Sequence, residues 1–378
     1  MIQKPIEPVV TDFLYRKASR LGLPFSGTFE LTPLCNMNCK MCYVRLTENQ
    51  QQRISPLATA KQWLELGKTA RDHGMLYLLL TGGEPFLHPE FPAILRGLHE
   101  MGLLVSVNTN ATLIDESAIS WLKKSPPVRV NVTLYGASDE TYERLCGEPK
   151  GFTKAVRGIQ LLHDAGIPVK INCSMTPDNV ADFPQIAAFC KENHLVLQYN
   201  SYMFPPARKD ENLVGRNFRF TPQDAAYYMA LAELVTGGED AFMSRNVPVP
   251  ELTDDCGYLG EGIRCRAGRC SFWVTWDGRL LPCGMFVLPD CPNVFTEDFV
   301  AAWEQIKQRV EQIRLPAKCA GCELKDHCKA CAAMVYTESG NFSDIPRYRC
   351  DMAHAFLPQR EKLKARIVAG QDAEVDSK

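Results

Sequence analysis

The chain of 378 residues is long enough for more than one domain, and its 46% hydrophobic and 23% charged residues are ordinary for a globular protein. A formal net charge of −2 excludes the strongly basic surface of most nucleic-acid-binding proteins. The longest apolar run, 75–80, is far shorter than the roughly 20 residues of a membrane-spanning helix, and no signal-peptide pattern begins the chain, so we expect a cytoplasmic protein that binds neither nucleic acid nor membrane.

Residues 1–26 are predicted to form a short helical segment, too short to be a domain of its own. Strand and helix patterns then alternate. Strands are predicted at 27–32, 75–81, 103–108, 128–135, 168–174 and 195–200. Helices are predicted at 59–74, 115–124, 152–166 and 182–194, with Asp115 and Asp182 as N-caps. Six such units predict an α/β fold with a parallel sheet, either a partial barrel or a doubly wound sheet, because a closed barrel needs eight.

Three cysteines follow the first predicted strand in the run TPLCNMNCKMCYV, and Tyr43 follows the last of them. Cys35, Cys39 and Cys42 are spaced C-x3-C-x2-C, whereas zinc sites usually use two distant C-x2-C pairs. Iron–sulfur clusters normally take four thiolates, so three leave one iron without a protein ligand. The spacing therefore favours a cluster that can bind a small molecule directly, as an open catalytic zinc site does.

The second predicted strand ends in Gly82-Gly83-Glu84-Pro85. Loops after parallel strands meet on one rim of the fold, so this motif should lie beside the cysteine loop. Glycine allows a ligand to approach the backbone closely, and free backbone groups with Glu84 nearby could meet an ammonium group. Taken by itself, the motif would be an ordinary turn.

The pattern changes after residue 202. A helix is predicted at 221–235, with Thr221 as N-cap and Pro222 at the first helical position. A linker at 237–255 leads to a cysteine-rich domain at 256–358 and a tail at 359–378, and the core domain is placed at 27–236. A hairpin turning at 277–278 should bring Cys270 and Cys283 towards each other. Weakly cored small domains are commonly held by metal. A zinc ribbon of Cys319, Cys322, Cys328 and Cys331 is the alternative to iron–sulfur clusters.

The cysteine spacing and the Gly-Gly-Glu-Pro motif together resemble the radical S-adenosylmethionine (SAM) enzymes. The resemblance implies a partial (β/α)6 barrel, a [4Fe–4S] cluster on Cys35, Cys39 and Cys42, and SAM bound to its open iron. It also implies reductive cleavage of SAM to a 5′-deoxyadenosyl radical that abstracts hydrogen from a substrate, with a flavodoxin or ferredoxin as electron donor. No side chain is assigned a catalytic role beyond the cluster. The SAM contacts that the resemblance implies are Gly82, Gly83, Glu84, Asn108 and Thr133. Asn108 and Thr133 are equally well explained as polar residues of a turn or a strand end.

The C-terminal cysteines resemble the SPASM extension of these enzymes, which holds two auxiliary [4Fe–4S] clusters. One departure is that two residues, not three, separate Cys328 from Cys331. The resemblance assigns one cluster to Cys265, Cys270, Cys283 and Cys331, and the other to Cys319, Cys322, Cys328 and Cys350. Five cysteines remain without an assigned role: Cys146, Cys173, Cys190, Cys256 and Cys291. Cys173 and Cys190 are expected to be buried. Cys256 and Cys291 are candidates for spare cluster ligands.

SPASM enzymes mainly modify peptides and proteins, so the resemblance favours a peptide or protein substrate, as in ribosomal-peptide maturation. A haem precursor or another small molecule is the alternative. A sulfatase-maturing role is disfavoured, because Gly284 stands where those relatives carry an Asp. With only residues 1–26 before the first strand, a leader peptide would need a separate protein or the barrel itself to bind it. The non-enzyme alternative is an iron–sulfur or zinc-binding interaction protein.

Overall fold

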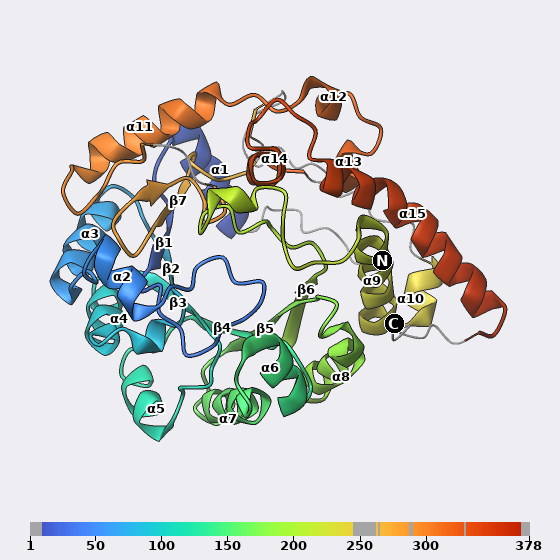
Figure 1. The fold of residues 1–378 in the computed structure, drawn as a ribbon. Helices are drawn as coiled ribbons and strands as arrows, with labels where there is room; N and C mark the ends of the chain where they lie inside the picture. The colour runs from blue at the N-terminus through green and yellow to red at the C-terminus, as the bar shows by residue number, and fades with distance from the viewer. Residues whose placement is uncertain (1–9, 245–261, 264, 287–289, 329, 372–378) are drawn as a thin grey trace.

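A curved, mostly parallel sheet with helices around its outer side forms the centre of the molecule (Figure 1). The computed structural model describes residues 10–244, 262–263, 265–286, 290–328 and 330–371. Its eight strands are ordered β6-β5-β4-β3-β2-β1-β7-β8. None of the helices in these ranges has the length and apolar character that a membrane crossing needs.

The first six strands pair in parallel with their neighbours in sequence, which confirms the predicted partial barrel. Each predicted strand is present within one or two residues of its expected bounds. The strands are β1 (Ser26–Glu30), β2 (Tyr77–Thr81), β3 (Leu104–Thr109), β4 (Arg129–Thr133), β5 (Val169–Ser174) and β6 (Val196–Asn200).

Helices connect these strands, and side-chain caps explain where two of them begin, of which only the cap at Asp115 was predicted. Thr59 and Gln62 form a capping box at the start of α3, and Asp115 caps α5. Asp182 is the N-cap residue of α8, as predicted, but its carboxylate makes no capping bond and instead accepts a hydrogen bond from Ala137 N at 2.7 Å. The helices are α1 (Val10–Leu21), α2 (Glu48–Ile54), α3 (Ala60–Asp72), α4 (Phe91–Glu100), α5 (Glu116–Leu122), α6 (Asp139–Cys146), α7 (Gly151–Asp164) and α8 (Phe183–Glu192).

The two faces of the parallel sheet differ in polarity. Side chains paired across neighbouring strands point to the same side, and one side is apolar and buried beneath the helices. That side includes Phe29, Leu80, Val107, Val130, Val132 and Ile171. The other side faces the inside of the barrel and is mostly polar, although Leu79 and Val196 also lie on it. It includes Thr28, Glu30, Thr81, Ser106, Asn108, Asn131, Thr133, Asn172, Ser174, Gln198 and Asn200. A polar interior predicts a ligand rather than a packed core.

The cysteine-rich region extends this sheet. Strand β7 (Ser271–Val274) pairs in parallel with β1, and β8 (Leu280–Leu281) pairs antiparallel with β7. The predicted hairpin is therefore confirmed, with Gly278 in the turn at φ +90°. Trp273 is paired with Leu281, so Cys270 and Cys283 lie just beyond the open end of the hairpin. The parallel pairing of β7 with β1 was not predicted from the sequence.

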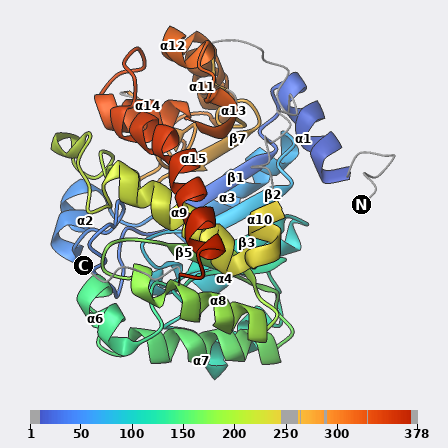
Figure 2. The same cartoon turned by 90° about the vertical axis from the view of Figure 1, so that its right-hand side faces the viewer.

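Helices of the C-terminal region complete the circle of elements seen in Figure 1. Helix α15 (Arg347–Val368) packs along α9 (Pro222–Gly237), as Figure 2 shows from the side. Thr221 and Pro222 begin α9 as predicted. The expected boundary at 358–359 falls inside α15, which continues through Pro358. The remaining helices are α10 (Glu239–Ser244), α11 (Phe299–Gln312), α12 (Ala317–Ala320), α13 (Lys325–Cys328) and α14 (Ala332–Ser339).

Candidate functional site

The loop after β1 carries Cys35, Cys39 and Cys42, all of them partly buried. Polar N–H groups point at two of their sulfur atoms. Met37 N donates to Cys35 Sγ at 3.4 Å, and Arg45 N donates to Cys42 Sγ at 3.3 Å. Hydrogen bonds of this kind orient metal-binding thiolates and tune the metal they hold. A hollow of about 450 Å³ lies against this loop, lined by Leu34, Cys35, Arg45, Leu46, Thr47, Glu48, Asn49 and Leu87.

The middle of the loop is attached to the C-terminal end of α6. Asn38 N donates to the Cys146 carbonyl at 2.7 Å, and Lys40 N donates to the Leu145 carbonyl at 3.0 Å. The side chain of Cys39, which lies between the two donors in sequence, is close enough to that of Cys146 for the two thiols to interact. Cys146 had no predicted role, and its sequence position, far from the cysteine loop, gave no signal of this contact.

The chemistry of the three thiols fits a metal cluster. Burial raises the pKa of Cys35 to about 12. The contact with Cys146, followed by burial, raises the pKa of Cys39. Such thiols ionise when a metal cation takes the place of the proton. Among the described residues, no three Cys, His, Asp or Glu side chains converge tightly enough to chelate a single metal ion. Three buried thiols at this spacing fit a [4Fe–4S] cluster held by three protein thiolates, and this ligation stays a prediction.

The Gly82-Gly83 pair lies directly beneath the cysteine loop. Gly83 N donates to Thr32 O at 2.7 Å, and Glu84 N donates to Leu34 O at 2.8 Å. A Cβ atom at Gly83 would lie 2.3 Å from Leu34 O, and one at Gly82 would lie 2.6 Å from Thr32 O. The glycines were predicted to let SAM approach. In the structure, they also let the backbone of the cysteine loop cross above them.

Glu84 is fully buried, and both of its oxygens accept hydrogen bonds from protein groups. Oε1 accepts from Thr109 Oγ1 at 2.8 Å and from Phe86 N at 3.2 Å, and Oε2 accepts from Asn110 N at 2.8 Å. Burial raises its pKa to about 7, although these bonds oppose the shift. The carboxyl group thus joins the β2 loop to the end of β3. The contact with an ammonium group stays a prediction.

Asn110 continues this chain of contacts to the cysteine loop. Its amide Nδ2 donates to Asn36 Oδ1 at 3.0 Å and reaches Cys35 Sγ at 3.8 Å. Glu84 therefore positions Cys35 through Asn110. From the sequence, Asn110 was expected to hydrogen-bond ribose hydroxyls together with Asn108, and its contact with the cysteine loop was not predicted.

Two further polar groups in the barrel interior lack partners. Asn108 Oδ1 accepts from Asn131 Nδ2 at 2.8 Å, but the Oδ1 atoms of Asn131 and Asn172 are buried without a hydrogen-bond partner in the described structure. Thr133 is paired with Asn172 in the strand register, which places the predicted contact beside these acceptors. Buried unpaired acceptors are uncommon and fit a ligand that carries hydroxyl or amino groups. Asn131 and Asn172 were missed, although strand alternation places them on the polar face.

A buried ion pair lies at the C-terminal end of β1. Arg208, from the loop after β6, donates to Glu30 Oε2 at 2.7 Å, and Trp273 Nε1 donates to the same oxygen at 3.0 Å. The side chains of Arg208 and Glu30 are only 7% and 1% exposed. Although burial alone favours the neutral form, the nearby Glu30 carboxylate raises the pKa of Arg208. The guanidinium also lies 5.2 Å from the ring centre of Tyr43. These contacts join the loop after β6 to the last residue of β1.

A second buried ion pair joins the barrel to the cysteine-rich region. Arg219 donates to Glu338 at 2.6 and 2.9 Å, and Tyr202 donates to the same carboxylate at 2.8 Å. Arg219 comes from the loop before α9, whereas Glu338 lies on α14. The bidentate geometry fixes the two segments relative to each other.

Some of the cysteines predicted to hold auxiliary clusters lie near others of the same predicted set. Burial, with Cys331 adding to it, raises the pKa of Cys283, which places these two thiols near each other. Burial raises the pKa of Cys350 too, and Cys328 and Cys322 add to that shift. These neighbours agree with the predicted division into two sets, whose ligation stays a prediction.

The other C-terminal cysteines have varied surroundings. Cys270 is fully buried and accepts a hydrogen bond from Ser19 Oγ at 3.0 Å, while Cys265 is exposed. Cys319 and Cys291 are partly buried. Cys256 lies outside the described residues. The expected burial of Cys173 and Cys190 is confirmed.

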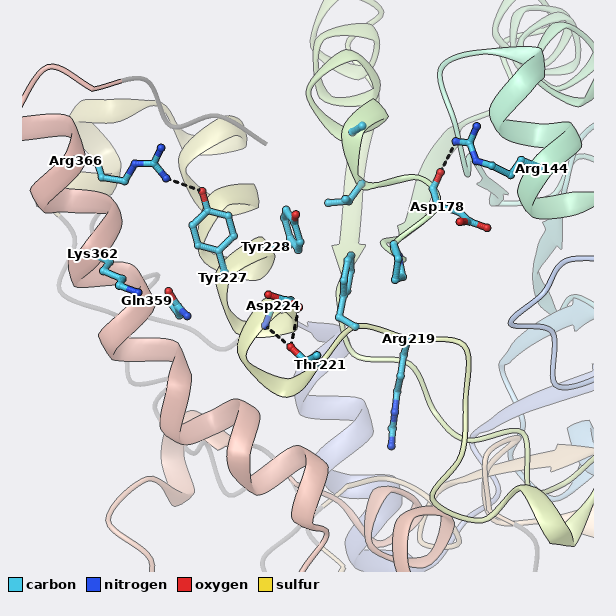
Figure 3. Close-up of a pocket in the computed structure, with 14 residues that line it drawn as sticks. Arg144, Asp178, Arg219, Thr221, Asp224, Tyr227, Tyr228, Gln359, Lys362 and Arg366 are labelled. Atoms are coloured by element: carbon cyan, nitrogen blue, oxygen red, sulfur yellow. Dashed lines mark hydrogen bonds between the residues drawn. The ribbon is translucent and has the colours of Figure 1, made fainter. Parts of the chain in front are cut away.

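A cavity of about 820 Å³ lies between the loop after β5, the start of α9 and the face of α15 (Figure 3). Arg366 bonds the Tyr227 hydroxyl at 3.4 Å, and Arg144 donates to the Asp178 carbonyl at 2.6 Å. The Asp178 carboxylate forms an ion pair with Lys40 of the cysteine loop. The cavity is lined by Arg144, Pro177, Asp178, Val180, Ala181, Arg219, Phe220, Thr221, Asp224, Tyr227, Tyr228, Gln359, Lys362 and Arg366.

Comparison with known proteins gives one family match. Residues 29–190 match the family model described as the Radical SAM superfamily. The chain is 24% identical over 341 residues to an AdoMet-dependent heme synthase of Methanosarcina barkeri, covering 85% of this chain and 94% of that protein. It is 25% identical over 314 residues to the antilisterial bacteriocin subtilosin biosynthesis protein AlbA of Bacillus subtilis, covering 82% of this chain and 66% of that protein.

Two solved structures have the same fold. Streptococcus suis SuiB bound to S-adenosylmethionine superposes with a TM-score of 0.66 at 20% identity, covering 86% of this chain and 77% of that one. The enzyme anSMEcpe with bound AdoMet gives a TM-score of 0.66 at 16% identity, covering 93% of this chain and 96% of that one.

Proposed function

We propose that this chain, a radical SAM enzyme with its radical SAM domain at residues 29–190, abstracts hydrogen from a side chain of a peptide or protein. The observation that carries the chemistry is the cysteine loop, which is held over Gly82 and Gly83 at the mouth of a polar barrel. The preference for a peptide rests on the cavity whose lining residue Asp178 is paired with Lys40 of that loop.

Cys35, Cys39 and Cys42 would hold the [4Fe–4S] cluster. When bound, the cluster supplies the single electron for reductive cleavage of SAM. The protein's part is to position the reactants and exclude water. Glu84 fixes the cysteine loop through Asn110.

The unpaired acceptors of Asn131 and Asn172 would receive hydroxyl or amino groups of SAM. Thr133 lies beside them and offers a further hydroxyl partner.

The cavity suits a peptide in its size and in its mixed polarity. Its volume of about 820 Å³ is in the range of small-molecule and short-peptide sites. Tyr227 and Tyr228 offer aromatic surface, and Asp224 with Lys362 offers charges of both signs. In Figure 3, these side chains come from two facing helices, and Asp178 connects the opposite wall to the cysteine loop. A peptide bound here would lie beside the radical-generating site.

The structure of the hairpin argues further against sulfatase maturation. Gly284 packs against the indole of Trp273, and a Cβ atom there would lie 2.8 Å from three ring carbons. An Asp cannot be accommodated at this position without moving Trp273, whose Nε1 donates to Glu30. A carboxylate base at position 284 is therefore incompatible with this arrangement.

A haem precursor is the second candidate substrate. Similarity to an AdoMet-dependent heme synthase extends over 85% of this chain, which favours that candidate. Four cationic side chains line the cavity, and three of them, Arg144, Lys362 and Arg366, could meet the carboxylates of a tetrapyrrole, whereas Arg219 is paired with Glu338.

Anaerobic turnover distinguishes the candidates. The reconstituted protein is incubated with SAM and dithionite, first alone and then with short peptides encoded near its gene or with an iron-bound tetrapyrrole carboxylate. We expect methionine and 5′-deoxyadenosine to form, and to form faster with a peptide whose mass changes. Stimulation by the tetrapyrrole alone would establish the second candidate, and no SAM cleavage under any condition would refute both.

A further inference from the structure

Charged side chains of both signs line the cavity between α9 and α15, and two of them are neutralised by partners outside it. Arg219 forms an ion pair with Glu338 at 2.6 Å, and both side chains of that pair are buried. Asp178 is paired with Lys40 of the cysteine loop. Because each pair is neutral as a whole, the other charged groups decide the electrostatic character of the cavity.

Those other groups are mainly cations. Arg144 donates to the backbone carbonyl of Asp178 at 2.6 Å, and neither Arg144 nor Lys362 forms an ion pair with any residue that the structure describes. Both side chains belong to exposed residues. The lining carboxylate outside the two ion pairs is Asp224. Positive charge therefore exceeds negative charge in the cavity, and Arg366 is not needed for that excess.

The cations lie on opposite walls with an aromatic surface between them. Figure 3 shows Lys362 on α15 at one side and Arg144 of α6 at the other. The rings of Phe220 and Tyr228 have their centres 4.8 Å apart, and those of Tyr227 and Tyr228 are 5.3 Å apart. Such packed rings offer a rigid apolar surface. The arrangement suits a ligand with negative groups at two separate points and a less polar part between them.

Two polar side chains favour a peptide over a ligand that carries only negative charges. Asp224 Oδ2 accepts from Thr221 Oγ1 at 2.8 Å, and a carboxylate has further acceptor sites for peptide N–H groups. Gln359 offers a donor and an acceptor from the α15 wall. A tetrapyrrole carboxylate brings no peptide N–H group and would be repelled by Asp224.

We propose that this cavity binds an acidic segment of the peptide substrate, whose carboxylates pair with Arg144 and Lys362 on its two walls. The inference rests on the proposed function, because it takes the cavity as the substrate site. Exposed ion pairs contribute little individually, but complementary charges select the partner and speed its association. The excess of positive charge thus distinguishes acidic peptides from neutral ones.

The test measures binding to the reconstituted holoenzyme by fluorescence anisotropy, without SAM or reductant. One labelled decapeptide alternates Glu with Ala, and its matched partner alternates Gln with Ala. At low ionic strength, the wild type should bind the Glu peptide about ten-fold more tightly than the Gln peptide, as two exposed ion pairs would produce. That difference should shrink as salt is raised to about 0.5 M, because salt screens exposed charges.

Charge reversal at each wall makes the result specific. Lys362→Glu and Arg144→Glu should each weaken binding of the Glu peptide about ten-fold, through lost attraction and added repulsion, and leave the Gln peptide unaffected. A decapeptide that alternates Lys with Ala should bind the two variants more tightly than it binds the wild type. Lys61→Glu on α3 is the matched control, because its side chain is 82% exposed and the change in charge is the same. It should bind all three peptides as the wild type does.

Equal affinity of the wild type for the Glu and Gln peptides would overturn the inference. So would a Lys362→Glu variant with wild-type iron content and melting temperature that binds the Glu peptide normally. Binding of coproporphyrin that depends on Lys362 and Arg144, with no binding of the Glu peptide, would overturn it in favour of a tetrapyrrole. SAM cleavage is assayed separately. If the wild type cleaves no SAM but shows the charge-dependent binding, the proposed function fails and the acidic-peptide site stands.

Discussion

Replacing Gly83 with Ala tests whether the Gly-Gly-Glu-Pro motif supports the cysteine loop. The added Cβ would lie 2.3 Å from Leu34 O, 2.7 Å from Leu34 C and 2.8 Å from Pro33 O. All three are backbone atoms, so no side chain can rotate away. The loop must instead move by roughly 1 Å to restore an ordinary contact distance.

The size of the effect follows from what that movement breaks. The bonds from Gly83 N to Thr32 O and from Glu84 N to Leu34 O contribute about 0.5–1.5 kcal/mol each. Overpacking of a tight contact adds about 1–3 kcal/mol. The sum is about 2–6 kcal/mol, or a fall of roughly 3–8 °C in melting temperature for a chain of this length. Leu34 directly precedes Cys35, so we also expect the first cluster to be lost, at about four irons per chain.

The assay combines iron and sulfide analysis with thermal melting of anaerobically reconstituted protein. Gly237→Ala serves as the matched control, because its Cβ would meet only the Cβ of Ala241, at 3.9 Å. This control should keep its iron and melting temperature. If Gly83→Ala keeps full iron content and an unchanged melting temperature but binds SAM weakly, the support argument is refuted. Gly83 would then act only through direct contact with the cofactor.

Three other perturbations test separate parts of the argument. Replacing Cys35, Cys39 and Cys42 together with Ala should abolish SAM cleavage and lower iron from about twelve to about eight per chain; retained cleavage would contradict the assignment. Because burial raises the pKa of Glu84 to about 7 from an ordinary 4.5, its stabilising contribution is present below pH 4.5 and is lost as the pH rises through 7. The melting temperature of the wild type relative to Glu84→Gln should therefore fall by roughly 4 °C, or about 3 kcal/mol, between pH 4.5 and 8, whereas a pH-independent difference would show that the carboxyl group does not titrate there. Glu338→Gln breaks a buried ion pair and should cost about 3–5 kcal/mol in thermal unfolding without loss of iron from the first cluster; an unchanged melting temperature would show that the pair contributes nothing.

Local patterns in the sequence were sufficient to predict the parallel strands. An apolar run such as 75–81 is typical of a strand buried between helices. Asp115 and Thr221 mark helix starts by their own side-chain chemistry. Asp182 carries the same signal but bonds Ala137 N, because the loop after β4 passes within reach of its carboxylate. A capping residue can thus be used by a distant segment, and that competition cannot be seen in the sequence.

The site was predictable to the extent that its chemistry lies in short motifs. Cys35 and Gly83 could be predicted as site residues from their short motifs alone. The side chains that contact the cysteine loop, however, come from other strands and helices. Asn110 reaches Cys35 from β3, and Cys146 reaches Cys39 from α6. The polar face that carries Asn131 could have been found from strand alternation, once the interior of the barrel was considered as a ligand site rather than as a core.

The two cysteine-rich regions are separated in sequence but depend on each other in the fold. Strand β7 covers the edge of β1, and Trp273 of β7 donates to Glu30, the last residue of β1. Arg208 reaches the same carboxylate from the loop after β6. Burial raises the pKa of both Tyr43, next to Cys42, and Cys283 of the predicted auxiliary set, and the positive charge of Arg208 opposes both shifts. The C-terminal region therefore completes the open barrel at the point where the cysteine loop begins. Because Glu30 is buried and accepts hydrogen bonds from both Arg208 and Trp273, displacing Arg208 would leave a buried charge without its ionic partner, and displacing Trp273 would remove one of its donors. The barrel and the cysteine-rich region must fold together for this site to form.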